Sequence, residues 1–347
     1  MKRNLCFSED GRMRENSHSE RGEESVILIP NGKKYKSVGF EIGIVKVCSQ
    51  PKDNSEKIRD ILILENGKKH LLFRIENREL TFFVTSKCNH RCIMCPQKLD
   101  IDSPDNDLIL RRVIENLDYD ELDGICFTGG EPMLKMPFIE QVVQNAPERI
   151  FITILTNGTI MPSEQILKSH RVKLCVPLYA PFDELHNKMT GSDSFYKVVE
   201  NLIKISQYET LIELRFVLTA QNWQCLSEYA RFVWRNLPFV QDVAFMGMEL
   251  TAEAHKNKSE LWVNPRDYVG ELQKAVEYLD DCGVSAWIYN LPLCLLEEKY
   301  RRFAVKSISP WKVRYLPKCE NCTMKADCGG MFFSAVGEFE GILGNNS

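Results

Sequence analysis

Three closely spaced cysteines, Cys88, Cys92 and Cys95, have the clearest capacity for chemistry in this sequence. Their C-x3-C-x2-C spacing allows three thiolates to bind three irons of one cubane [4Fe–4S] cluster. Four cysteines would close such a cluster for electron transfer, whereas three leave one iron open to a substrate or cofactor. A structural zinc site is the alternative, but zinc sites usually have C-x2-C pairs and four ligands. The spacing therefore favours a cluster that takes part in chemistry.

A second motif, Thr-Gly-Gly-Glu-Pro at 128–132, follows an apolar stretch, 124–127, that predicts a buried strand. Its two glycines let the backbone approach a ligand closely, and its glutamate adds a carboxylate. Alone, the motif would be an ordinary turn. One βα unit after the cysteines, it is much more specific. Its candidate binding residues are Gly129, Gly130, Glu131 and Pro132.

Together, the two motifs resemble the radical S-adenosylmethionine (SAM) superfamily, and the resemblance covers residues 80–290. It implies that Cys88, Cys92 and Cys95 hold a [4Fe–4S] cluster whose open iron is chelated by the amino and carboxylate groups of SAM. It also implies that the Gly-Gly-Glu-Pro loop lies against the methionyl amino group. No catalytic residue beyond the cluster ligands is identified.

Strand and helix patterns alternate through residues 80–290, which indicates a parallel sheet. The predicted strands are 81–85, 124–127, 150–155, 173–178, 211–218 and 242–246, with a further extended run at 284–289. The predicted helices include 195–205, 223–234 and 265–281. Six units favour an α/β fold built on a partial, TIM-like (β/α)6 barrel. Both motifs follow strand ends, so right-handed crossovers would bring them to one opening.

Five other residues are weaker candidates for SAM contacts. Met94 lies where the family usually has a residue that packs near adenine. Asn157 belongs to a turn that resembles the family's, although a plain strand-to-helix turn explains it equally well. Tyr179 and Asp183 lie in a loop whose counterpart touches the SAM ribose in many members. Arg215 alternates within an apolar strand and is expected inside the barrel, paired either with the SAM carboxylate or in a structural ion pair.

A second cysteine array lies near the C-terminus, with Cys319, Cys322 and Cys328 spaced C-x2-C-x5-C and Cys294 upstream. Four cysteines suffice for one closed [4Fe–4S] cluster. Zinc is the competitor, because four-cysteine sites with a C-x2-C pair often bind it. The spacing resembles the SPASM or shorter twitch extension of peptide-modifying radical SAM enzymes, which implies one auxiliary cluster. No cysteine follows Cys328, so a second auxiliary cluster is not expected.

Four regions are predicted along the chain. Residues 1–24 are polar and charged, as in a disordered tail. Residues 25–79 contain β-branched runs and two Asn-Gly turn signals, which predict a small β-rich subdomain. This subdomain could hold a peptide along a sheet edge or simply cover the barrel. The barrel then spans 80–290, and a cluster-binding extension spans 291–347.

Composition agrees with a globular enzyme. The chain has 347 residues, 44% of them apolar, so it can bury a large core. A formal charge of −4 gives no electrostatic argument for nucleic acid or an anionic membrane. No signal peptide or apolar run of about 18 residues is visible. The thirteen cysteines are therefore expected to be reduced and cytoplasmic, serving metals.

A closer resemblance extends over nearly all of the chain after residue 25. The segments that carry it are Cys-Asn-His-Arg-Cys-Ile-Met-Cys-Pro-Gln at 88–97, Leu-Tyr-Ala-Pro-Phe-Asp-Glu-Leu-His at 178–186, Arg-Phe-Val-Trp-Arg-Asn-Leu-Pro-Phe-Val at 231–240, Ile-Tyr-Asn at 288–290 and Ser-Ile-Ser-Pro-Trp at 307–311. They resemble the radical SAM maturases of His-Xaa-Ser peptide systems (the HxsC family). The resemblance implies a ribosomally made precursor peptide as substrate and a second radical SAM maturase as partner. An electron donor such as flavodoxin or ferredoxin would supply the reducing electron.

Two other functional classes stay open. One is a radical SAM enzyme that acts on a small molecule. The other is a non-catalytic iron–sulfur or zinc scaffold that presents a peptide to a second maturase. SAM cleavage separates enzyme from scaffold, and a peptide mass change separates peptide from small-molecule substrates.

Overall fold

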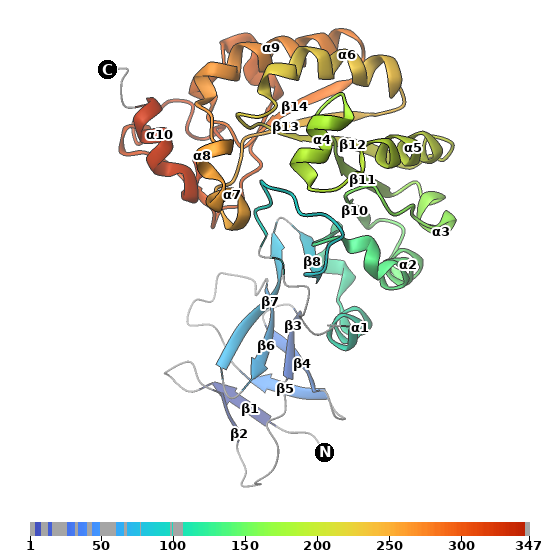
Figure 1. The fold of residues 1–347 in the computed structure, drawn as a ribbon. Helices are drawn as coiled ribbons and strands as arrows, with labels where there is room; N and C mark the ends of the chain where they lie inside the picture. The colour runs from blue at the N-terminus through green and yellow to red at the C-terminus, as the bar shows by residue number, and fades with distance from the viewer. Residues whose placement is uncertain are drawn as a thin grey trace. The chain divides into compact units, whose positions relative to one another are not determined.

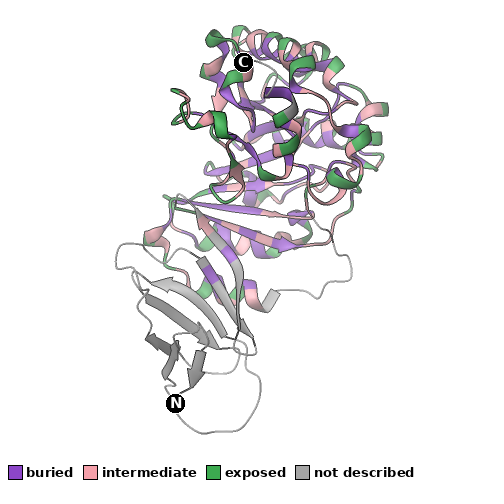
Figure 2. Cartoon of the chain, turned by 90° about the vertical axis from the view of Figure 1, so that its left-hand side faces the viewer, coloured by how far each residue is buried: buried purple, intermediate pink, exposed green. Residues whose placement is uncertain are grey.

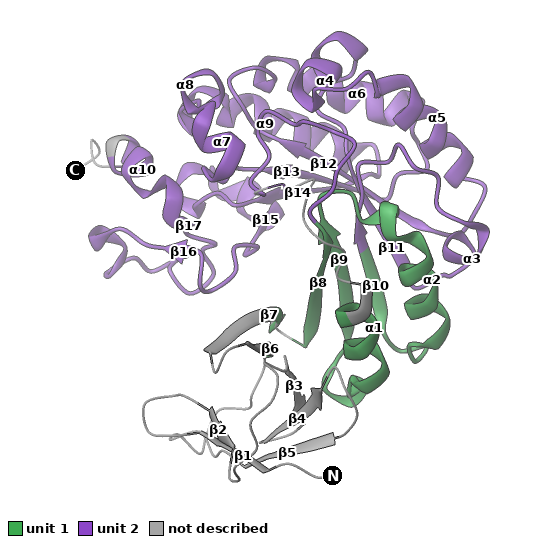
Figure 3. Cartoon of the chain, turned by 60° about the horizontal axis from the view of Figure 1, so that its bottom comes forward, with its two compact units in different colours: residues 1–85, 103–153 green, residues 86–102, 154–347 purple. Residues whose placement is uncertain are grey.

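The protein is described by a computed structural model, which covers residues 78–97, 99 and 107–343, together with strand segments between residues 4 and 76. The chain divides into two compact units, drawn in Figure 3. Unit 1 comprises residues 1–85 and 103–153, and unit 2 comprises residues 86–102 and 154–347.

The strands of unit 1 begin with a set whose pairs are antiparallel apart from the parallel β1–β5 pair. Its members are β1 (Asn4–Phe7), β2 (Met13–Glu15), β3 (Val26–Asn31), β4 (Lys34–Gly39), β5 (Ile44–Cys48), β6 (Asp60–Glu65) and β7 (Lys68–Glu76). The β3–β4 and β6–β7 pairs confirm the two hairpins predicted from the Asn-Gly signals. Within residues 1–24, for which a tail is predicted, β1 pairs with β2 and runs parallel to β5. The rest of 1–24 lies outside the described residues.

Strands β8 to β15 then form a parallel α/β arrangement in which the order along the sheet follows the order in the chain (Figure 1). They are β8 (Glu79–Thr85), β9 (Gly124–Gly129), β10 (Phe151–Leu155), β11 (Val172–Pro177), β12 (Leu211–Val217), β13 (Asp242–Met246), β14 (Ser285–Tyr289) and β15 (Ala304–Val305). This confirms the partial TIM-like barrel. The predicted extended run at 284–289 is the seventh parallel strand, and the two-residue β15 is an eighth.

The connections between these strands are helical, as the alternating pattern predicts. The α-helices are α1 (Asp107–Asn116), α2 (Met136–Asn145), α3 (Glu164–Leu167), α4 (Asp183–Thr190), α5 (Phe195–Ile205), α6 (Leu226–Asn236), α7 (Ala252–Lys256), α8 (Lys258–Leu261), α9 (Pro265–Asp281) and α10 (Val336–Leu343). Short 3-10 turns include η2 (Pro132–Lys135), η4 (Leu293–Leu295) and η6 (Pro317–Cys319), and a two-stranded ladder joins β16 (Val313–Arg314) to β17 (Met331–Phe332). No helix of the described residues is long and apolar enough to cross a membrane.

Aromatic side chains fill the core of each unit. In unit 1, Phe82 packs against Phe73 and Phe127, with ring centroids 4.8 and 5.8 Å away. In unit 2, Phe216 packs against Tyr229 at 4.7 Å. Figure 2 shows that buried residues gather along the parallel strands, whereas exposed residues lie mainly on the helices. Burial of these side chains provides the main driving force for the fold.

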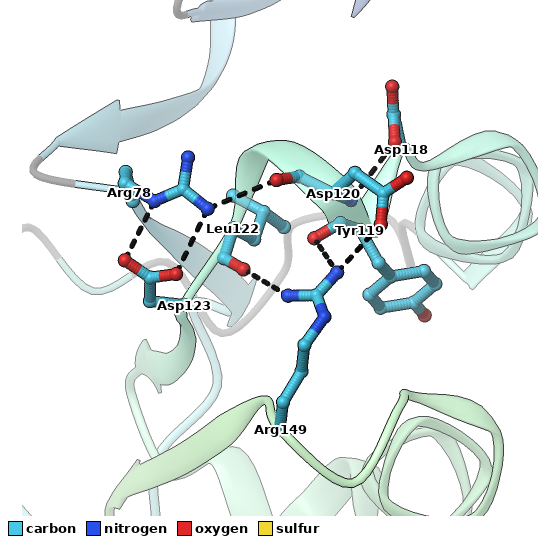
Figure 4. Close-up of polar contacts among 7 residues, drawn as sticks. All are labelled: Arg78, Asp118, Tyr119, Asp120, Leu122, Asp123 and Arg149. Carbon is cyan, nitrogen blue, oxygen red and sulfur yellow. Dashed lines mark hydrogen bonds and ion pairs between the residues drawn. The ribbon is translucent and has the colours of Figure 1, made fainter.

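Two arginines, Arg78 and Arg149, form hydrogen bonds to the segment that precedes β9 in unit 1 (Figure 4). Arg78, in the β7–β8 turn at φ 63°, donates from Nε and Nη2 to the two carboxylate oxygens of Asp123, at 2.7 and 3.0 Å. Arg149 donates to the carbonyl oxygens of Leu122 and Tyr119, each at 2.7 Å. These contacts fix the entry into β9, the strand that leads to the Gly-Gly-Glu-Pro motif.

Candidate functional site

The loop that carries Cys88, Cys92 and Cys95 follows β8 and belongs to unit 2. The end of α4 supports it, because the backbone N–H groups of Arg91 and Ile93 donate to the carbonyls of Thr190 and Met189, at 2.9 and 3.0 Å. A turn bond from Cys95 N–H to the Cys92 carbonyl, at 3.1 Å, brings the last two cysteines together. The cysteine loop is therefore held by its backbone, which leaves its thiols available as ligands.

Gly191 allows the close approach of α4 to this loop. It ends the helix in the left-handed region, at φ 62°, which favours glycine. A Cβ at this position would lie 2.7 Å from the carbonyl oxygen of Arg91. Only glycine therefore satisfies both the backbone conformation and the space.

The segment after β13 holds the other side of the cysteine loop. The Asn257 side-chain amide donates to the carbonyl of Ile93 at 2.9 Å, and the Thr251 hydroxyl donates to the carbonyl of Pro96 at 3.0 Å. The backbone N–H of Glu253 donates to the carbonyl of Cys95 at 3.1 Å. The sequence analysis missed these supports, because no local pattern links positions more than 150 residues apart.

Asn157 is joined to the cysteine loop by a third contact. Its side-chain amide donates to the side-chain oxygen of Asn89 at 2.6 Å, and its own oxygen accepts from the Thr159 hydroxyl at 2.7 Å. Asn89 in turn donates to that hydroxyl at 2.8 Å. The predicted candidate therefore lies beside the cysteines, and its hydrogen bonds position the loop.

The donor set and the space beside it fit an iron–sulfur cluster. Burial, followed by the neighbouring thiols of Cys95 and Cys88, raises the pKa of the Cys92 thiol to about 12. Cluster binding needs thiolates, so binding iron would displace protons here. Cys92 and Cys95 border a cavity of about 760 Å³, which lies in the range of small-molecule sites. These three cysteines could thus hold a cluster with room beside it.

Tyr179 and Met94 are buried in the same unit, and Asp183 begins α4. Burial raises the pKa of Tyr179, and the thiols of Cys92 and Cys95 add to the rise, which places its hydroxyl within electrostatic reach of the cysteines. The Tyr179 ring stacks on His186 with centroids 6.0 Å apart. Tyr179 is therefore well placed beside the cluster site.

His186 is buried and neutral beneath Tyr179. Its Nδ1 accepts from the Tyr179 backbone N–H at 3.3 Å, and its Nε2 lies 3.3 Å from the Ser194 hydroxyl. Burial, with a smaller contribution from His90, lowers the pKa of His186 to about 4.

This pKa predicts a loss of stability in mild acid. The unfolded chain binds a proton at His186 below its ordinary pKa of about 6.5, while the folded chain resists until about pH 4. The free energy of unfolding of the metal-free chain should therefore fall as pH decreases from 6.5 to 4. We expect His186→Gln to flatten this slope by up to about 1.4 kcal/mol per pH unit in urea titrations. Replacement of the exposed His170 by Gln is the control, and an unchanged slope in His186→Gln would contradict the prediction.

Arg215 forms an ion pair inside unit 2. Its Nε lies 2.7 Å from Glu213, whose other carboxylate oxygen lies 2.7 Å from Lys173. Lys173 also contacts Asp242 at 2.9 Å. Burial alone would raise the pKa of Glu213, but Arg215 and Lys173 lower it below its ordinary value. Of the two partners predicted for Arg215, the structural carboxylate is therefore present.

The Gly-Gly-Glu-Pro motif belongs to unit 1, at the end of β9. Gly129 has φ 144°, and a Cβ there would lie 2.3 Å from the carbonyl oxygen of Thr85. The Gly130 N–H donates to the same oxygen at 2.7 Å. Glu131 is fully buried and accepts from the Met133 N–H at 2.9 Å, with Pro132 opening η2. Position 129 thus needs glycine because its backbone lies against Thr85. Thr85 is the last residue of β8 and lies three residues before Cys88.

The four C-terminal cysteines line one pocket in unit 2: Cys294, Cys319, Cys322 and Cys328. Two backbone N–H groups, those of Leu293 and Gly330, lie 3.4 Å from the Cys328 sulfur. Burial raises the pKa of Cys294, and the thiols of Cys328 and Cys319 raise it further, so the sulfurs lie within electrostatic reach of one another. Hydrogen bonds to ligand sulfurs are a feature of iron–sulfur sites.

Within residues 78–97, 99 and 107–343, no group of three or more His, Cys, Asp or Glu side chains is arranged to hold one metal ion.

Comparison with known proteins gives one family. Residues 82–233 match the family model described as Radical SAM superfamily. The chain is 25% identical over 223 residues to the S-adenosylmethionine-dependent nucleotide dehydratase of Selenomonas ruminantium, covering 58% of this chain and 77% of that protein. It is 23% identical over 144 residues to a probable GTP 3',8-cyclase of Thermococcus kodakarensis, covering 40% and 47%. The chain thus spans about half the length of the second relative.

Among solved structures, one that this chain is similar to is Streptococcus suis SuiB bound to the precursor peptide SuiA. Its TM-score is 0.49 and its identity 16%, over 62% of this chain and 49% of that one. The structure of anSMEcpe with bound AdoMet has a TM-score of 0.47 and an identity of 19%, over 59% and 60%.

Proposed function

We propose, from the premise that this protein is a radical SAM enzyme, that it oxidises a ribosomally made precursor peptide of the His-Xaa-Ser type. The observation that carries the proposal is the pocket shared by four cysteines, Cys294, Cys319, Cys322 and Cys328, in addition to the cysteine loop. An oxidation of this kind leaves an electron on a substrate radical, and a second metal site could accept that electron. The resemblance of the quoted segments to His-Xaa-Ser maturases supplies the substrate class.

The cysteine loop would hold a [4Fe–4S] cluster through Cys88, Cys92 and Cys95. When bound, this cluster supplies one-electron chemistry that converts SAM into methionine and a 5′-deoxyadenosyl radical able to abstract a hydrogen atom from the substrate. The work of the chain is to bind, orient and exclude water. The contacts of Asn257, Thr251 and the end of α4 hold the backbone of the cysteine loop at Arg91, Ile93 and Pro96.

The SAM-binding residues of unit 2 in this proposal are Tyr179, Met94 and Asp183, while the Gly-Gly-Glu-Pro loop stays a candidate on the family resemblance alone. Tyr179 and Met94 are both buried and offer apolar surface with one hydroxyl group. Asn157 and Arg215 act in the proposal mainly through other residues, Asn89 and Glu213 respectively.

The C-terminal pocket would hold one auxiliary [4Fe–4S] cluster. Removal of two hydrogens from the peptide balances the conversion of one SAM into methionine and 5′-deoxyadenosine. One hydrogen atom would go to the adenosyl carbon and one proton to solvent, and the C-terminal cysteines would hold the group that accepts the remaining electron. A carrier protein such as flavodoxin or ferredoxin would take that electron away.

Replacement of Cys322 by Ala tests this role. We expect 5′-deoxyadenosine to form still, while the yield of peptide that is lighter by two hydrogens falls at least about tenfold. The reason is that the substrate radical then lacks its electron acceptor. Mass spectrometry of a His-Xaa-Ser peptide, beside 5′-deoxyadenosine quantitation, measures both. The buried Cys225, which has no place in either array, gives the control Cys225→Ala. Peptide oxidation at the wild-type rate in Cys322→Ala would disprove the auxiliary role.

A small-molecule substrate is the second candidate, because the relatives of this chain include proteins named for nucleotide chemistry. Incubation of the reconstituted enzyme with SAM and either the peptide or a nucleoside triphosphate separates the two. Substrate-dependent 5′-deoxyadenosine with the nucleotide alone would favour this second function.

A further inference from the structure

One short segment, residues 249–262, contacts both the cysteine loop and the extension that carries the C-terminal cysteines; we call it the bracket. Towards the cysteine loop it provides the Thr251 hydroxyl, the Glu253 N–H and the Asn257 amide, which hold the carbonyls of Pro96, Cys95 and Ile93. The acceptors are the carbonyl of Cys95 itself and those of Ile93 and Pro96, which directly follow Cys92 and Cys95. The bracket thus fixes the backbone from which these two thiols project.

The same segment also holds the C-terminal extension. Glu249 pairs with Lys312 at 2.9 Å, and the Lys312 carbonyl accepts from the Phe333 N–H at 2.8 Å. Lys258 pairs with Glu338 in α10, and the Trp262 ring packs edge-on against Phe339 with centroids 5.8 Å apart. Figure 1 shows α7 and α8 beside α10.

The extension contacts lie close to the four-cysteine pocket along the chain. Val313, which follows Lys312, pairs with Phe332 in the β16–β17 ladder. Gly330, one residue before β17, donates its N–H to the Cys328 sulfur, and the Val313 side chain fills the space beside Gly330. A change in the cysteine pocket therefore reaches Lys312 through a single two-residue ladder.

The bracket is held firmly enough to transmit such a change. The Glu249 and Lys312 side chains are only 15% and 30% exposed, so salt screens their attraction less than that of a surface pair. Ala252 has φ 44°, a conformation that a non-glycine residue keeps only where its surroundings fix it. Because the bracket is anchored on both sides and its backbone is strained at Ala252, it has few alternative positions.

We propose that the bracket couples the two cysteine sites, so that metal bound at either site strengthens the retention of metal at the other. Metal in the C-terminal pocket orders the loop around Gly330, which favours the Glu249–Lys312 pair and hence the cysteine loop beyond it. Because coupling between binding sites is reciprocal, metal at the cysteine loop must favour metal in the pocket. The inference rests on the proposed function, in that both arrays hold iron–sulfur clusters.

The rate of iron release tests the coupling without any measurement of catalysis. The full-length protein is reconstituted anaerobically and mixed with an Fe(II) chelator, and the chelate is followed by its absorbance. A Cys92→Ala variant identifies the phase that belongs to the cysteine loop. We expect this phase to be at least about fivefold faster in Cys322→Ala and in Lys312→Met, the change that removes the pair with Glu249.

Three controls separate coupling from general damage. Lys299→Met removes a Lys–Glu pair of the same 2.9 Å length, with Glu277, away from the bracket, and should release iron at the wild-type rate. Lys312→Arg keeps the charge and should restore slow release. In Cys92→Ala, the iron of the C-terminal pocket should leave faster than in wild type.

The outcomes are distinct. Release of cysteine-loop iron at the wild-type rate in both Cys322→Ala and Lys312→Met would overturn the coupling, while two loaded clusters would leave the proposed function intact. Wild-type protein that never acquires cysteine-loop iron would overturn the proposed function, and the coupling with it.

Discussion

The Cys92→Ala variant should lose all cysteine-loop iron and all detectable cleavage of SAM. Wild-type protein reconstituted anaerobically should hold about eight irons per chain, as two [4Fe–4S] clusters, and the variant about four. The Cys92 thiol lies near those of Cys95 and Cys88, and alanine supplies no ligand in its place. Iron and sulfide assays, with chromatography of 5′-deoxyadenosine, provide the measurement.

A cysteine outside both arrays gives the matched control. Cys126 is buried in β9, and Cys126→Ala removes a thiol that belongs to neither array. It should retain about eight irons and wild-type SAM cleavage. Equal iron in wild type and Cys92→Ala would be incompatible with the site described here, and about four irons with one zinc in wild type would identify the C-terminal pocket as a zinc site.

The Gly191→Ala variant should be strongly damaging although it leaves every proposed ligand in place. The added Cβ would meet the Arg91 carbonyl oxygen at 2.7 Å, and the left-handed conformation disfavours any side chain. We expect a loss of about 2–4 kcal/mol in the free energy of unfolding, together with faster iron release from the cysteine loop. Urea titration and chelator release measure the two effects.

The Gly283→Ala variant separates the effect of the left-handed backbone conformation from the effect of steric crowding. Gly283 also has positive φ, at 79°, but a Cβ there would meet nothing within 4 Å. Gly283→Ala should therefore lose only about 1–2 kcal/mol, the cost of the left-handed conformation, and should retain its iron normally. Equal losses in both variants would show that the contact with Arg91 has no energetic role.

Local patterns predicted the parallel strands well. β13, α5 and α9 have the bounds that periodicity indicated, because apolar spacing, helix length and a proline near the start of α9 all point to the same elements. Short strands escaped prediction. β15 and β16 have two residues each and form through partners far along the chain, so their own sequence carries little signal.

The candidate site was predictable where spacing defines chemistry and unpredictable where tertiary contacts define it. Both cysteine arrays could be read directly, and the structure brings all four C-terminal cysteines to one pocket. For Asn157, the sequence suggested a ligand contact or a turn, but its side chain bonds to Asn89. Asn257 carried no local signal, since its acceptor lies 164 residues earlier.

The distant supports of the cysteine loop also set an order of events during synthesis. Cys88, Cys92 and Cys95 are translated early, but their backbone partners at Met189 and Thr190 follow about 100 residues later, and Thr251 and Asn257 later still. At about 5–20 residues per second, the last of these partners, Asn257, is synthesised on the order of ten seconds after the cysteines. Iron delivered before that point would meet an unsupported peptide. Cluster insertion is therefore a late step, and a nascent chain that stops before the bracket would present three cysteines without the framework that retains a cluster.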